Sequence, residues 1–146
     1  MTDRHECLKE FPVVIALPLL WGDQDAFGHV NNVVYLRWAE TARVEYLRRA
    51  GLWPELPPEK LGPILASIKC DFKLPLTHPD QVQVGTRISR VGNSSMRMDH
   101  RIVSQAAGAV AAEVESTLVL LDYSVHAPVS VPEEMRRAIA ALEASV

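Results

Sequence analysis

Ten consecutive residues near the N-terminus combine side chains that acid–base and nucleophilic chemistry use. The segment DQDAFGHVNN, residues 23–32, contains two aspartates, a glycine, a histidine and two adjacent asparagines. An apolar pattern with helical spacing follows at once, so these side chains lie at the start of a helix. The first backbone N–H groups of a helix have no intrahelical acceptor, and such donors can stabilise a developing oxyanion. The segment therefore predicts a reactive loop beside an oxyanion site.

The residue types in this segment favour hydrolysis of a thioester. A carboxylate just before the helix, from Asp23 or Asp25, can attack a carbonyl carbon or activate a water molecule. Gly28 has no side chain, so substrate or backbone can approach it closely. The other polar side chains can orient water, carboxylate or substrate: His29, Asn31 and Asn32. A thiol has a pKa of about 8.5, so a thiolate leaves without a strong general acid, and a thioester suits this loop better than an amide.

Two other interpretations of the segment account for less of it. The first is helix capping alone, with Asn31 or Asn32 as the N-cap and both aspartates near the positive end of the helix. Capping normally needs one such residue, so the glycine and the histidine stay unexplained. The second is a calcium loop, because DQDAFG matches the start of an EF-hand, but Phe27 and Val34 stand where that loop requires oxygen ligands. We therefore expect no metal site.

The elements that position the segment form an α+β pattern. Residues 11–21 are typical of a strand, and Pro12 and Pro18 favour an edge position. Helical periodicity extends over residues 32–50, with Gly51 as the residue that ends the helix. A proline-rich connection is then predicted at residues 53–63, strands at 64–74, 82–91, 96–103 and 107–123, and a closing helix at about 130–146 with Pro132 as its first residue. A sheet with one covered face needs a second copy of the chain, so we expect a homo-oligomer.

Length and composition predict one domain over residues 1–146 and a cytoplasmic location. Hydrophobic residues make up 48% of the chain, and neither a membrane-spanning run nor a signal-peptide pattern is visible. The net charge of −3 argues against a nucleic-acid partner. The two cysteines, Cys7 and Cys70, have no paired spacing and are expected to be inert thiols. His100 lies on an apolar strand face, which indicates a core histidine.

A longer stretch around the reactive loop resembles a known family signature. WGDQDAFGHVNNVVYLRWAETAR, residues 21–43, is similar to the signature of the hotdog-fold 4-hydroxybenzoyl-CoA thioesterase family, most closely to its bacterial acyl-CoA thioesterase branch. The resemblance implies a curved antiparallel β-sheet wrapped around one long central α-helix. It also implies a homodimer or homotetramer whose sheets pair edge to edge, with acyl-CoA sites at the dimer interface. CoA would be part of the substrate, and no separate cofactor is implied.

The resemblance also implies roles for individual residues. The catalytic aspartate of the family matches Asp25, not Asp23, and Gly28 matches the glycine before the helix. The oxyanion-binding amide would lie around Asn31 and Asn32. His29 matches a histidine that assists catalysis in plant acyl-ACP thioesterases.

Three further matches concern substrate binding. Tyr35 is expected to contact the substrate. Arg90 and Arg97 flank the turn GNSS, where the 4-hydroxybenzoyl-CoA enzyme has basic residues, and are expected to meet CoA phosphates. The plant enzymes have an asparagine at the position of Phe27 and a helix carboxylate one position beyond Glu40. These two departures leave the catalytic set of the plant enzymes incomplete in this chain. The shared HVNN, residues 29–32, nevertheless also fits an acyl-ACP thioesterase, and the same fold could instead form a non-catalytic module that binds acyl thioesters.

Overall fold

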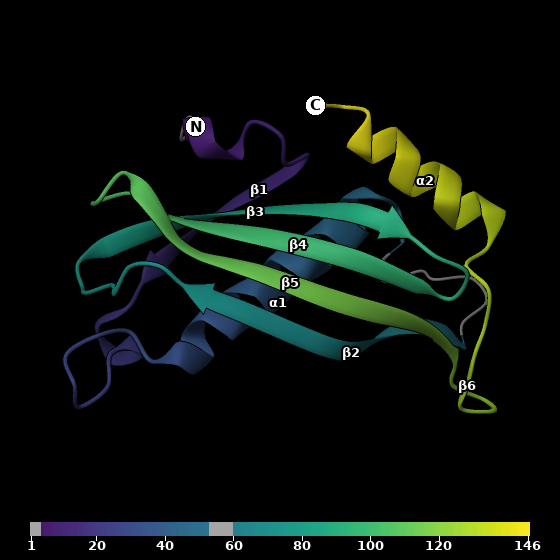
Figure 1. Cartoon of the computed structure of the whole chain (residues 1–146), viewed down its shortest axis with the longest axis horizontal. Coiled ribbons are helices and arrows are strands. Elements are labelled where there is room, and N and C mark those ends of the chain that lie inside the picture. Colours follow the sequence, from purple (N-terminus) through teal and green to yellow (C-terminus); the bar gives the residue numbers. More distant parts are fainter. Residues whose placement is uncertain (1–3, 53–59) are drawn as a thin grey trace.

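A curved antiparallel sheet with one long helix against its inner face forms the body of the protein. The computed structural model describes residues 4–52 and 60–146. The strand order is β1-β3-β4-β5-β2, with the short strand β6 paired to β5. The helix α1 (Asn32–Arg49) runs diagonally behind the strands in Figure 1, and α2 (Glu133–Glu143) lies beside the last part of β3. The strands are β1 (Val13–Leu19), β2 (Leu61–Phe72), β3 (Asp80–Val91), β4 (Ser95–Ser104), β5 (Ala109–Asp122) and β6 (Ala127–Pro128).

This architecture confirms the predicted α+β fold, with corrections at the ends of elements. Strand β2 begins three residues before the predicted start, because Gly62 and Pro63 belong to the strand and not to the connection. Pro63 is tolerated there because β2 is an edge strand, so one side of its backbone needs no ladder hydrogen bonds. Pro132 is the N-cap of α2 and not its first helical residue. The rest of the predicted connection, residues 53–59, lies outside the described residues.

Both ends of α1 follow from the sequence. The Asn31 side chain caps the start by accepting a hydrogen bond from the Val33 amide at 2.9 Å. At the other end Gly51 takes a φ of 75°, which a residue without a side chain adopts at little cost. The Leu52 amide then donates to the Leu47 carbonyl at 2.8 Å, which closes the last turn.

The helix covers the inner face of the sheet unevenly. Its buried face packs mainly on β1, β3 and β4, with two alanines, Ala39 and Ala42, allowing a close approach. The inner face of the edge strand β2 stays partly open. Leu65 is 40% exposed and Phe72 is 46% exposed. Ile68 and Cys70, which lie between them on the same face, are half-buried, so this face of β2 is incompletely covered along its length.

A group of buried polar side chains lies between two apolar clusters of the core. Thr86 on β3 pairs in register with His100 on β4, and Ser116 on β5 is the diagonal neighbour of His100. The Thr86 hydroxyl lies 2.8 Å from the Nδ1 atom of His100. His100 is 2% exposed, which confirms it as a core histidine. Burial, and then the charge of Arg43, lowers the pKa of His100 to about 3.

Helix α2 is held at both of its ends. The Glu143 carboxylate accepts hydrogen bonds from the Tyr46 hydroxyl at 2.5 Å and from the Ile88 amide at 3.1 Å. Strand β1 pairs with β3 only as far as Thr86, so the Ile88 amide would otherwise lie at an open edge. Near the other end, Arg136 donates to the Gly92 carbonyl at 2.7 Å. Helix α2 thus covers the part of β3 that β1 does not reach.

Replacing His100 with asparagine is expected to reduce the acid sensitivity of the fold. In the unfolded chain a histidine has a pKa of about 6.5, whereas native His100 stays neutral down to about pH 3. Between about pH 6.5 and pH 3 only the unfolded state binds this proton. As the pH is lowered through this range, the free energy of unfolding of the parent should therefore fall by about 1.4 kcal/mol per pH unit more than that of His100→Asn. Urea unfolding across this pH range measures both slopes. Equal slopes would contradict the prediction, whatever the offset between the two proteins.

Candidate active site

The two aspartates of the reactive loop have different environments. Asp23 is buried, and one oxygen, Oδ1, accepts a hydrogen bond from Arg37 at 2.7 Å. Its Oδ2 accepts from the Leu20 amide at 2.9 Å, and its backbone carbonyl accepts from the Asn31 amide at 2.9 Å. Asp23 therefore ties the end of β1, the loop and the start of α1 together. Both side-chain oxygens of Asp23 and its backbone carbonyl thus accept hydrogen bonds that stabilise the fold.

Asp25 is exposed and sits in a tight turn. Its Oδ1 accepts a hydrogen bond from the Phe27 amide at 2.9 Å, and its carbonyl accepts from the Gly28 amide at 3.0 Å. Gly28 has a φ of 82°, a conformation that residues with side chains rarely adopt. The Asp25 amide donates to the His29 carbonyl at 3.0 Å, which closes the loop. Within the described chain no donor contacts the second oxygen, Oδ2, so this oxygen stays available.

The first amides of α1 are used unequally. The Asn31 amide donates to the Asp23 carbonyl, and the Asn31 side chain occupies the Val33 amide. The Val34 amide donates to the Asn31 carbonyl at 2.9 Å. Among the described residues the Asn32 amide has no acceptor. Of the two adjacent asparagines, Asn31 is therefore the cap, and Asn32 carries the free donor.

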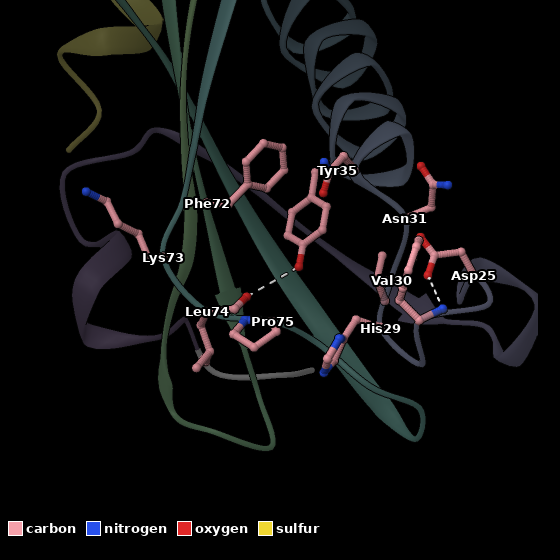
Figure 2. A pocket seen from close by; sticks show the side chains of 11 residues that line it. Asp25, His29, Val30, Asn31, Tyr35, Phe72, Lys73, Leu74 and Pro75 are labelled. Atoms are coloured by element: carbon pink, nitrogen blue, oxygen red, sulfur yellow. Dashed lines mark hydrogen bonds between the residues drawn. The ribbon is translucent and has the colours of Figure 1, made fainter.

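A cavity of about 480 Å³ brings the loop and the helix start together with a distant part of the chain. Asp25, His29, Asn31, Asn32 and Tyr35 all line it, as Figure 2 shows for those that it labels. The opposite wall comes from the end of β2 and the residues that follow: Phe72, Lys73, Leu74 and Pro75. The Val30 amide donates to the Leu76 carbonyl at 2.9 Å, which holds the two walls together.

Tyr35 forms part of the cavity wall. Its ring stands edge-on to Phe72, with ring centroids 5.0 Å apart, and its hydroxyl donates to the Leu74 carbonyl at 3.3 Å. Burial, and then the neighbouring Cys70, raises the pKa of Tyr35, so its phenol stays protonated at neutral pH. Burial also raises the pKa of Cys70 to about 11, as expected for an unreactive thiol. Tyr35 and Phe72 give the cavity an aromatic wall. Because the pKa values of Tyr35 and Cys70 are raised, neither residue supplies a base in addition to Asp25.

His29 lines the cavity without contacting the aspartate. Figure 2 shows its imidazole directed away from the Asp25 carboxylate. The described residues form no hydrogen bond between these two side chains. The exposed ring is therefore free to meet a water molecule or a ligand.

Three residues that the sequence suggested as site residues do not line this cavity in the single chain. Arg90 and Arg97 line a separate hollow of about 340 Å³ at the turn between β3 and β4. Arg97 is paired with Glu115 at 2.7 Å and with Asp99 at 3.2 Å, so its charge is already balanced. Glu40 lies in a groove between α1 and β1.

Sequence reasoning missed the whole β2 side of the cavity and also Phe27. Phe27 lines the cavity while 88% of its side chain is exposed, the largest such fraction among the described large apolar residues. The sequence signal that could have identified Phe27 is the presence of an aromatic residue within an otherwise polar loop. Phe72 and Lys73 carry no comparable local signal, because their position depends on strand pairing about forty residues away.

The described residues offer no group of three histidine, cysteine or acidic side chains placed to hold a metal ion. Among the same residues, no helix is long and apolar enough to cross a membrane.

A curved antiparallel sheet around one long helix is the hotdog fold, and the relatives of this chain identify it as a thioester hydrolase of that fold. The chain belongs to the thioesterase-like superfamily, whose family model matches residues 19–139. A thioesterase from Thermus thermophilus, crystallised with coenzyme A and zinc, has a similar structure. That comparison has a TM-score of 0.81 and 34% sequence identity, and it covers 93% of this chain and 97% of the other.

Two curated bacterial proteins are also similar in sequence. The acyl-CoA thioesterase YbgC of Haemophilus influenzae is 27% identical over 130 residues, which are 88% of this chain and 91% of the relative. The long-chain acyl-CoA thioesterase FadM of Escherichia coli is 21% identical over 112 residues, which are 77% of this chain and 85% of the relative. The similarity in each case extends over more than three quarters of this chain.

Exchanging each aspartate for asparagine should separate their two roles. Asp23→Asn removes a buried charge that Arg37 and the Leu20 amide contact, so we expect it to lower the free energy of unfolding by about 1–3 kcal/mol. The exposed Asp25→Asn should change that free energy by less than about 0.5 kcal/mol. Urea unfolding of both variants checks this. Equal losses in the two variants would refute the distinction.

Proposed function

We propose that this protein hydrolyses an acyl-CoA to the free carboxylic acid and CoA. One observation carries the proposal: the available oxygen of Asp25 and the free amide of Asn32 belong to residues that line the same cavity. A carboxylate and a preorganised oxyanion donor are the minimum equipment for cleaving a thioester. The acyl-CoA substrate is supported by the names of the two curated relatives and by the CoA-bound structural neighbour.

In the proposed reaction Asp25 acts as a general base. It takes a proton from a water molecule while the water oxygen bonds to the thioester carbonyl carbon. The negative charge moves to the carbonyl oxygen, where the Asn32 amide stabilises it. When the carbonyl re-forms, the C–S bond breaks, and the CoA thiolate leaves and takes up the proton that Asp25 holds. Direct attack by Asp25, followed by hydrolysis of the resulting anhydride, uses the same geometry.

The neighbouring residues support this arrangement. The Phe27 amide fixes one oxygen of Asp25 and so sets the direction of the carboxylate. Gly28 keeps the turn free of side chains where the substrate approaches. His29 is proposed to orient the attacking water, and Asn31 to hold the helix start in place. Tyr35 is proposed to contact the acyl group through its ring, since its hydroxyl is already bonded.

Replacing Asp25 should abolish most of the activity. Asp25→Asn and Asp25→Ala are expected to lower kcat by about 100-fold or more, because general-base catalysis contributes that much. Thiol release from short, long and aromatic acyl-CoAs measures the effect. Asp71→Asn, an exposed carboxylate on β2 outside the cavity, is the matched control and should retain parental turnover. Parental turnover of both Asp25 variants on every acyl-CoA that the parent cleaves would show the assignment to be wrong.

The open edge of β2 supports the proposed self-association. Among the described residues strand β2 pairs with β5 alone, and its apolar inner face is partly exposed. Antiparallel pairing of two β2 edges would place the start of one strand beside the end of the other. The start of β2 lies at the same end of the sheet as the turn between β3 and β4, because the Leu120 amide there donates to the Ser94 carbonyl. Arg90 of the partner subunit would then approach the cavity of this subunit.

A charge on the inner face of β2 should therefore disrupt the assembly and the activity together. Leu65→Asp is expected to yield a monomer by light scattering and to lose most turnover, because the charge would be buried without a partner. Val44→Asp is the control, since Val44 is also exposed but lies in the groove beside β1. A monomeric parent, or a Leu65→Asp variant that keeps the parental mass, would count against pairing through β2.

A further inference from the structure

Lys73 is the cationic residue at the mouth of the cavity. Of the described residues that line the cavity, it is the only lysine or arginine. Its side chain is exposed, and within the described chain its ammonium group has no ion pair or hydrogen bond. Figure 2 shows the ammonium group extending outward from the end of β2, away from Tyr35 and on the far side of the cavity from Asp25.

The backbone that carries Lys73 is firmly held. Its amide and the Leu74 amide both donate to the Ala111 carbonyl, at 2.8 and 3.1 Å. The Tyr35 hydroxyl binds the Leu74 carbonyl on the cavity side. The backbone of Lys73 is thus fixed at the cavity wall, and its flexible side chain with the ammonium group extends into solvent. This placement is typical of a residue that contacts the outer part of a ligand.

The charge of the proposed substrate makes this position significant. The cavity presents the carboxylate of Asp25 to the ligand, and the whole chain has a net charge of −3. A substrate whose carrier bears phosphate groups is repelled by both. In the extended carrier the phosphates are separated from the thioester by the pantetheine arm, so a compensating cation has to lie at a distance from Asp25. Within the single chain Lys73 meets this requirement. Arg37 is engaged by Asp23 and Arg97 by Asp99 and Glu115, while Arg90 lines a separate hollow.

We infer that Lys73 binds a phosphate group at the outer end of the pantetheine arm and makes the site selective for phosphorylated carriers over plain pantetheine thioesters. This inference rests on the proposed thioesterase function, and it names the part of the substrate that the single chain recognises. The phosphate could belong to the nucleotide of CoA or to a 4′-phosphopantetheine group. Both present a tetrahedral anion that an ammonium group binds as a point charge.

The test compares one acyl group on three carriers: CoA, 4′-phosphopantetheine and pantetheine. Lys73→Gln should raise KM for the acyl-CoA about two- to fivefold, as expected for one exposed charge contact, and leave kcat unchanged. Its kinetics on acyl-pantetheine should equal those of the parent. A matching loss on acyl-phosphopantetheine locates the contact at the 4′-phosphate, and a loss on acyl-CoA alone locates it at the nucleotide; either result supports the inference.

A nearby lysine provides the control. Lys69→Gln removes a charge from β2, four residues before Lys73. Lys69 pairs with Asp71 and lies outside the cavity, so all three substrates should behave as with the parent. Parental kinetics of Lys73→Gln on acyl-CoA, or an equal loss on all three carriers, would overturn the inference.

Binding measured without turnover separates this inference from the proposed function. Calorimetric titration with free CoA and with pantetheine should show that Lys73→Gln weakens CoA binding about two- to fivefold and leaves pantetheine binding unchanged. If the parent cleaves none of the thioesters but this difference in binding holds, the hydrolase proposal fails and the phosphate contact stands. If the parent cleaves acyl-CoA and the variant binds CoA as tightly as the parent, the phosphate contact fails alone.

Discussion

The buried carboxylate of Asp23 is the constraint on which the candidate site depends. It accepts hydrogen bonds from Arg37 on α1 and from the Leu20 amide at the end of β1, while its backbone carbonyl accepts from Asn31. A carboxylate with 7% of its surface exposed is stable only when such donors compensate for its lost hydration. Because these donors come from the strand, the loop and the helix, satisfying the charge fixes all three relative to one another. The position of Asp25, two residues further on, follows from that arrangement.

The loop divides its polar groups between folding and chemistry. The Asn31 side chain and carbonyl serve two of the first helical amides, and its own amide serves Asp23. The Phe27 and Gly28 amides close the turn around Asp25. One carboxylate oxygen and the Asn32 amide are then left over among the described groups. Capping and the proposed catalysis are therefore not alternatives, because the same cap that stabilises the helix determines which donor stays free.

The sequence was sufficient to predict the long elements, since periodicity and capping are local properties, but not the short strand β6. The start of α1 is predicted correctly because Asn31 and Asn32 precede an uninterrupted helical pattern. The start of β2 is predicted too late, because a glycine and a proline at Gly62 and Pro63 usually interrupt strands. Their cost is small here only because β2 lies at the edge of the sheet, and that position depends on the complete strand order.

The candidate site could be predicted only on its loop side. The family resemblance selects Asp25 over Asp23, and burial separates the two residues in the same way, although the local sequence around each is equally polar. The opposite wall depends on contacts between distant segments, such as the Tyr35 ring against Phe72 and the Val30 amide bonded to the Leu76 carbonyl. No local pattern encodes these contacts.

The shape of the sheet links the proposed assembly to the proposed chemistry. Helix α1 covers β1, β3 and β4 and leaves the inner face of β2 partly open, and the end of that same strand supplies the aromatic wall of the cavity. Phe72 is therefore both a wall residue and, at 46% exposure, part of the uncovered face. Oxyanion stabilisation by a backbone amide is strongest where water is excluded, because the effective dielectric constant is then low. In the single chain the β2 wall of the cavity is itself partly exposed, so a second copy that covers this strand would bury apolar surface and exclude water from the thioester in one step.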